Sequence, residues 1–171
     1  MPTSVLVGYA TRYSSTQEVA DTVAETLRER GLAVDIRPLR EVDTLVEYGA
    51  VVMGAPLYMF RWHKDAHRFL SRQRETLMER PVAVFALGPT HDPHDEKEWQ
   101  DSWGQLNKAL AKYPWFAPVA LEMFGGKYDP AKLRFPISML TGDEPATDIR
   151  DWKAIREWAG SVAAKFEPAL S

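Results

Sequence analysis

The stretch VLVGYATRYSSTQEVADTVAETL, residues 5–27, contains an apolar run, a hydroxyl-rich segment and an amphipathic pattern in immediate succession. The apolar run, SVLVGYA (4–10), is typical of a strand that is buried on both faces. Apolar residues then repeat at helical spacing over 19–27 and stop at Gly31, which suits a helix C-cap. The stretch therefore predicts a buried strand, a polar loop and a helix.

The same alternation of strands and helices recurs along the chain. Further strands are expected over residues 32–39, 49–56, 81–88 and 117–126, with the strand at 49–56 ended by Gly54 and Pro56. Helices are expected over residues 66–77, 99–110 and from near Asp151 to Phe166, and residues 40–48 are a weakly marked candidate for another. This order predicts an α/β fold, in which a doubly wound five-stranded parallel sheet carries helices on both faces.

Composition limits the classes of function that the chain can have. The 171 residues are expected to form a single domain over 1–171, and the absence of cysteine excludes a disulfide, a thiolate metal site and a cysteine nucleophile. A net charge of -3 gives no general attraction for nucleic acid or anionic membranes. No apolar run reaches the length of a membrane span, and the N-terminus lacks the features of a signal peptide. We expect a soluble, cytoplasmic protein without integral membrane association.

A doubly wound sheet binds ligands beyond the carboxyl ends of its strands, which directs attention to the loops 11–17, 55–63 and 88–97. In the first loop, a helix N-terminus flanked by Thr11, Ser14, Ser15 and Thr16 can hold a phosphate through backbone N–H groups and hydroxyls. The alternative is that one hydroxyl caps the helix and the others face solvent. The loop lacks both the Walker pattern and the glycine fingerprint of dinucleotide-binding folds, which disfavours ATP and NAD.

The other two loops are aromatic and polar, respectively. Tyr58, Phe60 and Trp62 follow a strand, and as a cluster they suit stacking on a flat heterocycle, although a core role explains any one of them alone better than a ligand contact does. His91 and His94 lie in a proline-bearing loop without the spacing of zinc motifs. We therefore expect a polar turn in which Asp92 or Asp95 caps the next helix, and no metal site.

Taken together, these segments resemble a known family. The strand, hydroxyl-rich loop and helix of residues 5–27 are similar to the FMN-phosphate loop of flavodoxins. The stretch GAPLYMFRWHKDAHRFL (54–70) is similar to the flavin-ring loop of the flavodoxin-like branch that includes menaquinone-dependent protoporphyrinogen oxidase. The closing DIRDWKAIREWA (148–159) resembles the last helix of that branch. The resemblance implies a flavodoxin-like fold with non-covalently bound FMN.

The resemblance also implies a set of cofactor-binding residues. The FMN phosphate would be surrounded by Thr11, Arg12, Tyr13, Ser14, Ser15, Thr16 and Gln17. One side of the flavin ring would be bordered by Ala55, Pro56, Leu57, Tyr58 and Met59. The other side would be bordered by Gly88, Pro89, Thr90 and His91, with Asp95 nearby. Ser14 stands where the family usually carries glycine, which leaves open whether serine can take glycine's place.

Three uses of such a fold compete. An electron carrier would pass electrons between the flavin and redox partner proteins, and an oxidase-type enzyme would oxidise a porphyrinogen and reduce a quinone. A flavin-free binding module is the third. The flavin itself is the redox agent, and the sequence offers no convincing Ser-His-Asp set or pair of catalytic carboxylates.

The charge of the chain and the segment 125–150 help to distinguish the carrier from the oxidase. Flavodoxin carriers are typically strongly acidic around the flavin, whereas this chain has a mild net charge and a basic helix after the ring loop, with Lys64, Arg68, Arg72 and Arg74. These basic residues suit either contact with an anionic substrate or a solvated helix face. The proline-broken segment 125–150 lacks the long helix-prone insertion of the oxidases. We expect it to cover the sheet edge, and a lid or docking loop is the alternative. On balance we expect an FMN-dependent redox protein of the carrier type, with a redox partner protein or a quinone as acceptor.

Overall fold

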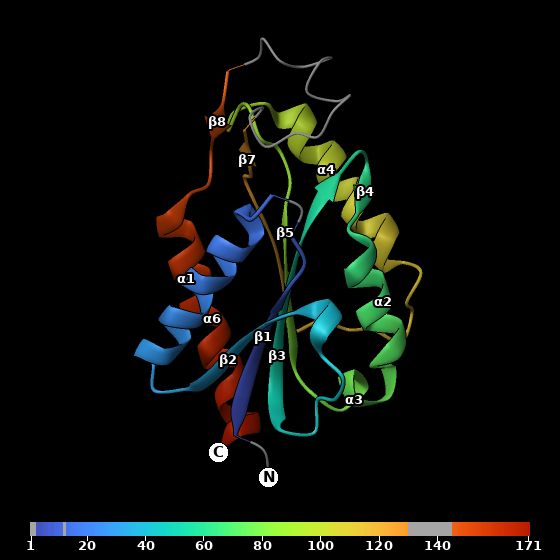
Figure 1. The fold of residues 1–171 in the computed structure, drawn as a ribbon, viewed down its shortest axis with the longest axis vertical. Helices are drawn as coiled ribbons and strands as arrows, with labels where there is room; N and C mark the ends of the chain where they lie inside the picture. The colour runs from blue at the N-terminus through green and yellow to red at the C-terminus, as the bar shows by residue number, and fades with distance from the viewer. Residues whose placement is uncertain (1–2, 12, 130–144) are drawn as a thin grey trace.

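A parallel sheet forms the centre of the molecule (Figure 1). The computed structural model describes residues 3–11, 13–129 and 145–171. The sheet has the order β2-β1-β3-β5-β6, and all neighbouring strands along this order are parallel. Its strands are β1 (Ser4–Tyr9), β2 (Ala33–Pro38), β3 (Tyr48–Tyr58), β5 (Val82–Leu87) and β6 (Ala120–Phe124). The predicted doubly wound fold is confirmed.

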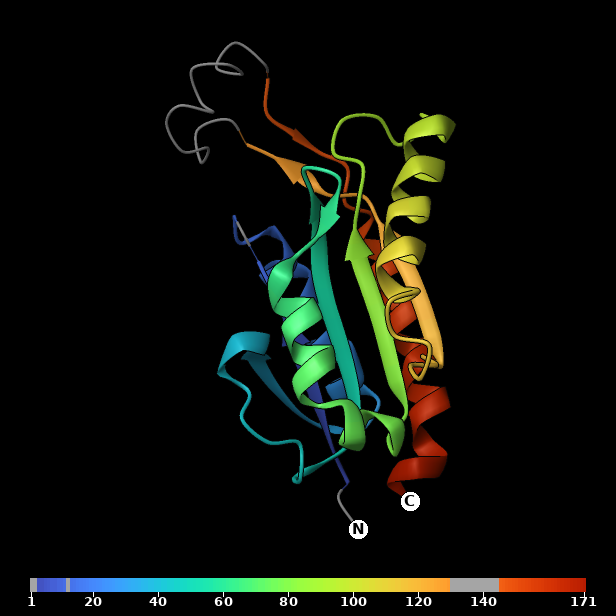
Figure 2. The same cartoon turned by 90° about the vertical axis from the view of Figure 1, so that its right-hand side faces the viewer.

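Helices cover both faces of this sheet (Figures 1 and 2). One face is covered by α1 (Ser15–Glu29) and α6 (Trp152–Leu170), and the other by α2 (Lys64–Arg72), α3 (Arg74–Met78) and α4 (Glu96–Leu110). Strand β1 shows why the sheet needs both layers, because Val5 and Val7 belong to the core beneath α1 and α6, whereas Leu6 belongs to the core on the opposite face. A strand that alternates between two cores must be apolar throughout.

The predicted helix over 66–77 is interrupted, and that over 40–48 is almost absent. Helix α2 ends before Gln73, whose buried side chain donates a hydrogen bond to the Asp43 carbonyl oxygen at 3.1 Å, and α3 follows it. Between β2 and β3 there is only a short 3-10 turn, η1 (Leu39–Glu41). The apolar residues of this connection, Leu39, Val42 and Leu45, are buried one by one in the core. Their burial explains the weak helical pattern without a helix.

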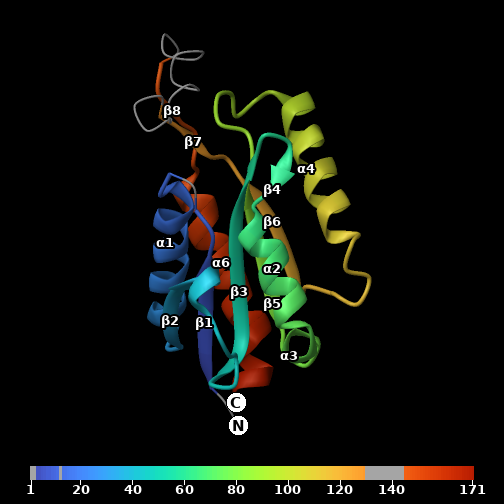
Figure 3. The same cartoon turned by 45° about the vertical axis from the view of Figure 1, so that its right-hand side comes forward.

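Strand β3 runs past the expected stop at Gly54 and Pro56 to Tyr58. Its end turns back into a short antiparallel strand, β4 (Arg61–Trp62), with Leu57 opposite Trp62 and Tyr58 opposite Arg61. Pro56 is tolerated because it lacks only an N–H donor, while its carbonyl oxygen accepts from the His63 N–H at 3.1 Å. The expected aromatic loop is therefore largely a hairpin that projects above the sheet (Figure 3).

Two further strands lie beyond the carboxyl ends of the sheet. Strands β7 (Lys127–Tyr128) and β8 (Thr147–Asp148) form an antiparallel pair. The segment 125–150 was expected to cover the sheet edge, but its described ends lie above the sheet instead (Figure 1). Its apolar residues Leu133, Phe135, Ile137, Met139 and Leu140 lie outside the described residues.

Candidate functional site

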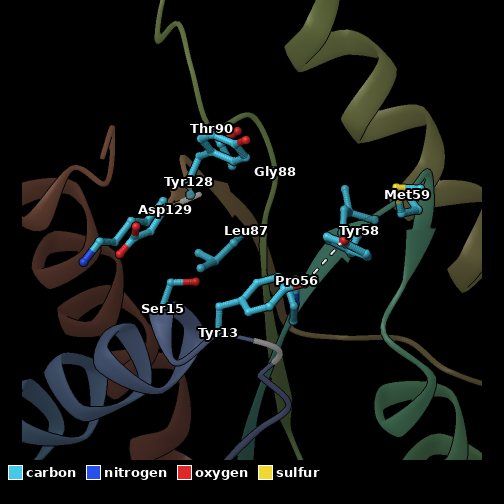
Figure 4. A pocket seen from close by; sticks show the side chains of 13 residues that line it. Tyr13, Ser15, Pro56, Tyr58, Met59, Leu87, Gly88, Thr90, Tyr128 and Asp129 are labelled. Carbon is cyan, nitrogen blue, oxygen red and sulfur yellow. Dashed lines mark hydrogen bonds between the residues drawn. The ribbon is translucent and has the colours of Figure 1, made fainter. Parts of the chain in front are cut away.

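A pocket lies at the carboxyl edge of the sheet, beside the point where the strand order reverses. Strand β1 has β2 on one side and β3 on the other, so the loops after β1 and β3 flank a crevice. The pocket there has a volume of about 310 Å³, within the usual range for ligand sites. It is lined by Tyr13, Ser15, Pro56, Leu57, Tyr58, Met59, Leu87, Gly88, Thr90, Gly126, Lys127, Tyr128 and Asp129 (Figure 4).

The loop after β1 presents a helix N-terminus with unused hydroxyls. The hydroxyl oxygens of Thr11 and Thr16 are buried and have no hydrogen-bond partner among the described residues. Thr16 is 0% exposed, which makes a missing hydrogen bond costly. Ser14 precedes α1, and its side chain makes no capping hydrogen bond, which leaves the first-turn N–H groups without the side-chain acceptor that often caps them. Hydroxyls and a helix N-terminus together match the donors that a phosphate needs.

Ser14 adopts the conformation that glycine usually supplies. Its φ is 69°, in the left-handed region that side chains with a Cβ rarely enter. The backbone path expected of the family's glycine is therefore present with serine in its place. Its side chain is exposed, so the loop keeps that path without placing the serine in the core.

Arg150 links this loop to the end of the chain. Its guanidinium donates to the Asp148 carboxylate at 2.7 Å, lies 3.5 Å from the Glu18 carboxylate and donates to the Ser15 carbonyl oxygen at 3.3 Å. The side chain is only 3% exposed and lies over the Trp152 ring. These bonds lower the pKa of Asp148, chiefly through the hydrogen bond from Arg150, and raise the pKa of Arg150. The start of α1 is thus tied to β8 by a charged contact.

The hairpin β3–β4 forms an apolar wall of the pocket. Its two-residue tip, Met59 and Phe60, has φ values of 51° and 66°, as a type I′ turn requires. Such turns usually carry Asn-Gly, whereas here two large apolar side chains are 68% and 83% exposed. Below the tip, the Trp62 indole donates to the Ala55 carbonyl oxygen at 3.2 Å and fixes the hairpin to the sheet.

The opposite wall comes from the segment after β6, which the three selected loops did not include. Tyr128 and Asp129 lie across the pocket from Tyr58 and Met59 (Figure 4). The Tyr128 ring packs 4.9 Å from the His91 ring, and its buried hydroxyl has no partner in the described part of the chain. The sequence contained a signal for this wall, because KYD (127–129) directly follows the fifth predicted strand and so lies at the same carboxyl edge.

The candidate residues divide into those that line the pocket and those that shape it. Eight line it directly: Tyr13, Ser15, Pro56, Leu57, Tyr58, Met59, Gly88 and Thr90. Thr11, Ser14 and Thr16 form the first loop, Ala55 and Pro89 are buried, and Gln17 is exposed. His91 supports Tyr128, and Asp95 accepts from the Glu98 N–H at 3.1 Å and so caps α4, as expected. Arg12 lies outside the described residues.

The described residues offer neither a metal-binding cluster nor a membrane-spanning helix. Residues 3–11, 13–129 and 145–171 contain no group of three or more His, Cys, Asp or Glu side chains placed to hold a metal ion. In the same ranges no helix has the length and apolar character needed to cross a membrane.

Comparison with known proteins agrees with the fold. The model of the flavodoxin domain family matches residues 6–136. Protoporphyrinogen IX dehydrogenase [quinone] of Escherichia coli K12 is 22% identical over 174 residues, covering 92% of this chain and 93% of the relative.

Solved structures show the same fold. Flavodoxin 1 from Bacillus cereus superposes with a TM-score of 0.58 at 16% identity, covering 98% of this chain and 99% of that one. A short-chain flavodoxin associated with a bacterial microcompartment superposes with a TM-score of 0.62 at 15% identity over the full length of both chains. With a family match over most of its length and the sheet order on which that family is built, the chain belongs to the flavodoxin domain family.

Proposed function

We propose that this chain is a single-domain, cytoplasmic redox protein that binds FMN non-covalently and carries electrons through it. The observation that carries the proposal is the pair of buried hydroxyls, on Thr11 and Thr16, that have no partner among the described residues at the start of α1. Buried polar groups without a partner are rare in folded proteins, and a phosphate bound here would supply the missing acceptor. Their place beside a pocket walled by tyrosines suits a ligand with a phosphate at one end and a flat ring at the other.

The residues divide the task of holding such a ligand. The N–H groups at the start of α1 and the hydroxyls of Thr11 and Thr16 would hold the phosphate, while Arg150 keeps that helix end in place through the Ser15 carbonyl oxygen. Tyr58 and Tyr128 would border the ring from opposite walls, and the Tyr128 hydroxyl is a donor still without an acceptor among the described residues. FMN, when bound, supplies the redox chemistry, so the protein has only to bind, orient and shield it.

A second candidate function is the oxidation of a porphyrinogen with a quinone as acceptor. It is favoured by the likeness to protoporphyrinogen IX dehydrogenase [quinone] over 92% of this chain. The identity of 22% is too low to transfer the substrate, and the carrier function needs nothing beyond the flavin site.

Flavin titration tests the first candidate. The purified chain is titrated with FMN and with riboflavin, which lacks the phosphate, and binding is followed by flavin fluorescence and absorbance. We expect FMN to bind at least about tenfold more tightly, since each hydrogen bond to a charged group contributes roughly 1.5–3 kcal/mol. Equal affinities would refute the phosphate role of the first loop. A chain that takes up neither flavin would be a flavin-free binding module.

A turnover assay separates the two redox candidates. The FMN-loaded protein is incubated under anaerobic conditions with protoporphyrinogen and a quinone analogue, and porphyrin formation is followed by absorbance. The carrier function predicts no turnover above the rate of free FMN at the same concentration. Turnover well above that rate would establish the dehydrogenase function instead.

A further inference from the structure

A second cleft, rich in positive charge, lies on the other side of the β3–β4 hairpin from the flavin pocket. It runs between α2, β4 and α4, which lie together on one face of the sheet (Figures 2 and 3), and has a volume of about 610 Å³. Five cationic side chains line it: Arg61 from β4, Lys64 and Arg68 from α2, and Lys108 and Lys112 from α4. We call these five residues and the space between them the basic cleft.

The lining of the basic cleft contains cations without carboxylates, whereas Glu98 and Asp101 line the adjoining hollow. No carboxylate lines the basic cleft, although the whole chain has a net charge of -3. None of the five cations forms an ion pair within the described residues. Lys64 is moreover the first residue of α2, where the helix dipole disfavours a cation. All five residues are exposed, and like charges gathered in this way repel one another, so an anion bound between them would be favoured.

The other basic residues of this region have structural partners. Arg72 donates to the Leu39 carbonyl oxygen at 3.4 Å, and the Arg74 guanidinium lies 5.5 Å from the centre of the Trp115 ring. The basic helix seen in the sequence thus splits into two residues that support the fold and two, Lys64 and Arg68, that face the cleft. Only the second pair is joined by cations from α4.

The cleft is also shaped for a small molecule. The exposed Phe60 ring stands at its rim, and the buried Trp62 and the partly buried His67 contribute to its lining. Burial and the nearby Lys112 lower the pKa of His67, so this ring is neutral at pH 7. A concave space with cations on two facing helices encloses a compact anion better than it fits the broad surface of a protein.

We propose that the basic cleft binds a small organic molecule with two or more acidic groups, either phosphates or carboxylates. The cleft adjoins the flavin pocket, because a hollow between them shares Phe60 and Gln105 with the cleft and Leu57 and Gly88 with the pocket. Glu98 and Asp101 also line this hollow, so an anion is favoured in the cleft and not in the hollow. An anion bound there lies beside the hairpin that walls the flavin site. The claim that this anion reacts with the flavin rests on the proposed function, whereas the claim that it binds in the cleft does not.

The test measures binding of two defined anions by calorimetry. Benzene-1,3,5-tricarboxylate represents carboxylates and inorganic pyrophosphate represents phosphates, each titrated into the FMN-loaded full chain in about 50 mM salt. We expect at least one of them to bind at one site per chain and to bind more weakly as salt is raised. The double variant Arg68→Gln/Lys108→Gln, with one change on each helix, should weaken that binding about tenfold.

A matched control separates the cleft from general charge. The double variant Lys153→Gln/Lys165→Gln also removes two exposed positive charges, but on α6, which covers the opposite face of the sheet, and should change the affinity less than about twofold. If neither anion binds, or if both double variants lose affinity equally, the proposal is overturned. The anion that binds more tightly shows whether the cleft favours carboxylate or phosphate groups.

Loading with FMN keeps the phosphate loop from competing for the probes. Should FMN not bind, the proposed function fails, and the titration is repeated in a Thr16→Val background. A signal that survives Thr16→Val and falls in Arg68→Gln/Lys108→Gln still supports the basic cleft. A signal that Thr16→Val abolishes places the anion in the loop and overturns it.

Discussion

Two turns at the same pocket hold the backbone in the same rare conformation with opposite kinds of residue. Ser14, Met59 and Phe60 are the non-glycine residues with positive φ within the described chain. Met59 lines the proposed flavin pocket with Phe60 next to it, and Ser14 stands between Tyr13 and Ser15, which both line that pocket. The loop at Ser14 is small and polar, with buried hydroxyls beside it. The hairpin tip at Met59 and Phe60 is large, apolar and exposed.

The difference indicates two separate reasons for accepting strain. Left-handed backbone costs roughly 1–2 kcal/mol for a residue with a Cβ, and such strain gathers at functional sites. In the loop, strain brings N–H groups and the hydroxyls of Thr11 and Thr16 to one place. At the hairpin tip, it holds two apolar side chains in solvent, between the flavin pocket and the basic cleft. We therefore propose that the loop is a binding element and that the tip is a contact element.

The largest expected effect is that of Thr16→Val on FMN affinity. Valine keeps the shape of threonine and removes the buried hydroxyl, so FMN should bind about 10–100-fold more weakly while riboflavin binding is unchanged. Without flavin, the variant should unfold at the same or a higher temperature, because an unsatisfied buried group is gone. Fluorescence titration and thermal unfolding measure the two effects.

Thr26→Val is the matched control on the same helix. The Thr26 hydroxyl donates to the Thr22 carbonyl oxygen at 2.9 Å, far along α1 from the loop. This variant should lose some stability and keep its FMN affinity. If Thr16→Val binds FMN as tightly as the wild type, the loop is not the binding element and the comparison fails.

The next effect is that of Arg150→Met, which removes the support behind the loop. The Asp148 and Glu18 carboxylates would lose their partner, but both are about half exposed, so we expect a loss of about 1–2 kcal/mol in the free energy of unfolding. FMN affinity should fall less than in Thr16→Val, because the phosphate donors themselves remain. Arg80→Met is the control, since Arg80 donates to the Tyr48 carbonyl oxygen away from the pocket. Equal losses of FMN affinity in both variants would contradict the role of Arg150.

Acid should weaken the same support. The folded-state pKa of Asp148 lies below its ordinary value of about 3.9, so its contribution is complete above that pH and is lost as pH falls through the lowered pKa. Urea unfolding from pH 6 to pH 3 should thus show a smaller loss in Asp148→Asn than in the wild type. The effect is smaller than that of Arg150→Met, because the Ser15 carbonyl oxygen still accepts from Arg150. Identical pH profiles would remove Asp148 from the account.

The sequence predicts the sheet and the loop far better than it predicts the hairpin. Strands such as β1 alternate between two buried cores and leave a continuous apolar run, which local composition reveals. The loop is equally visible, as small hydroxyl residues between a strand and a helix. The turn at Met59 and Phe60 carries neither Asn nor Gly, so the local sequence does not predict it. The turn forms because Trp62 pairs with Leu57 across the hairpin and its indole N–H donates a hydrogen bond to the Ala55 carbonyl oxygen. Only the folded sheet provides these two contacts.

The remaining parts of the site are formed by residues that lie far apart in the sequence, so the sequence does not predict them. Arg150 is separated from Ser15 by 135 positions, and nothing in the residues near either one indicates the contact. The basic cleft joins cations of α2 to those of α4, whereas the sequence shows only the first group as a charged helix. The sequence does predict a place for Tyr128 near the site, because ligands bind at the carboxyl ends of the strands and the fifth strand ends just before this residue.

The smallest effect directly compares the two turns by placing glycine in each. Ser14→Gly and Phe60→Gly should each raise the free energy of unfolding by about 0.5–1 kcal/mol, because glycine relieves the left-handed strain but adds freedom to the unfolded chain. Val46→Gly, at an exposed residue outside the positive-φ set, should lower it and serves as the control. Urea unfolding of the flavin-free chains measures all three.

The two glycine variants should differ in what they do to ligands. Ser14→Gly should keep FMN affinity within about threefold, because the N–H groups and threonine hydroxyls that form the binding element remain. Phe60→Gly should also spare FMN but weaken benzene-1,3,5-tricarboxylate in the basic cleft, since it removes the ring at the rim. A loss of FMN affinity above tenfold in Ser14→Gly would make the serine hydroxyl itself a phosphate ligand. The strain at Ser14 would then serve to place a side chain, as it does at Phe60, and the two turns would be of one kind.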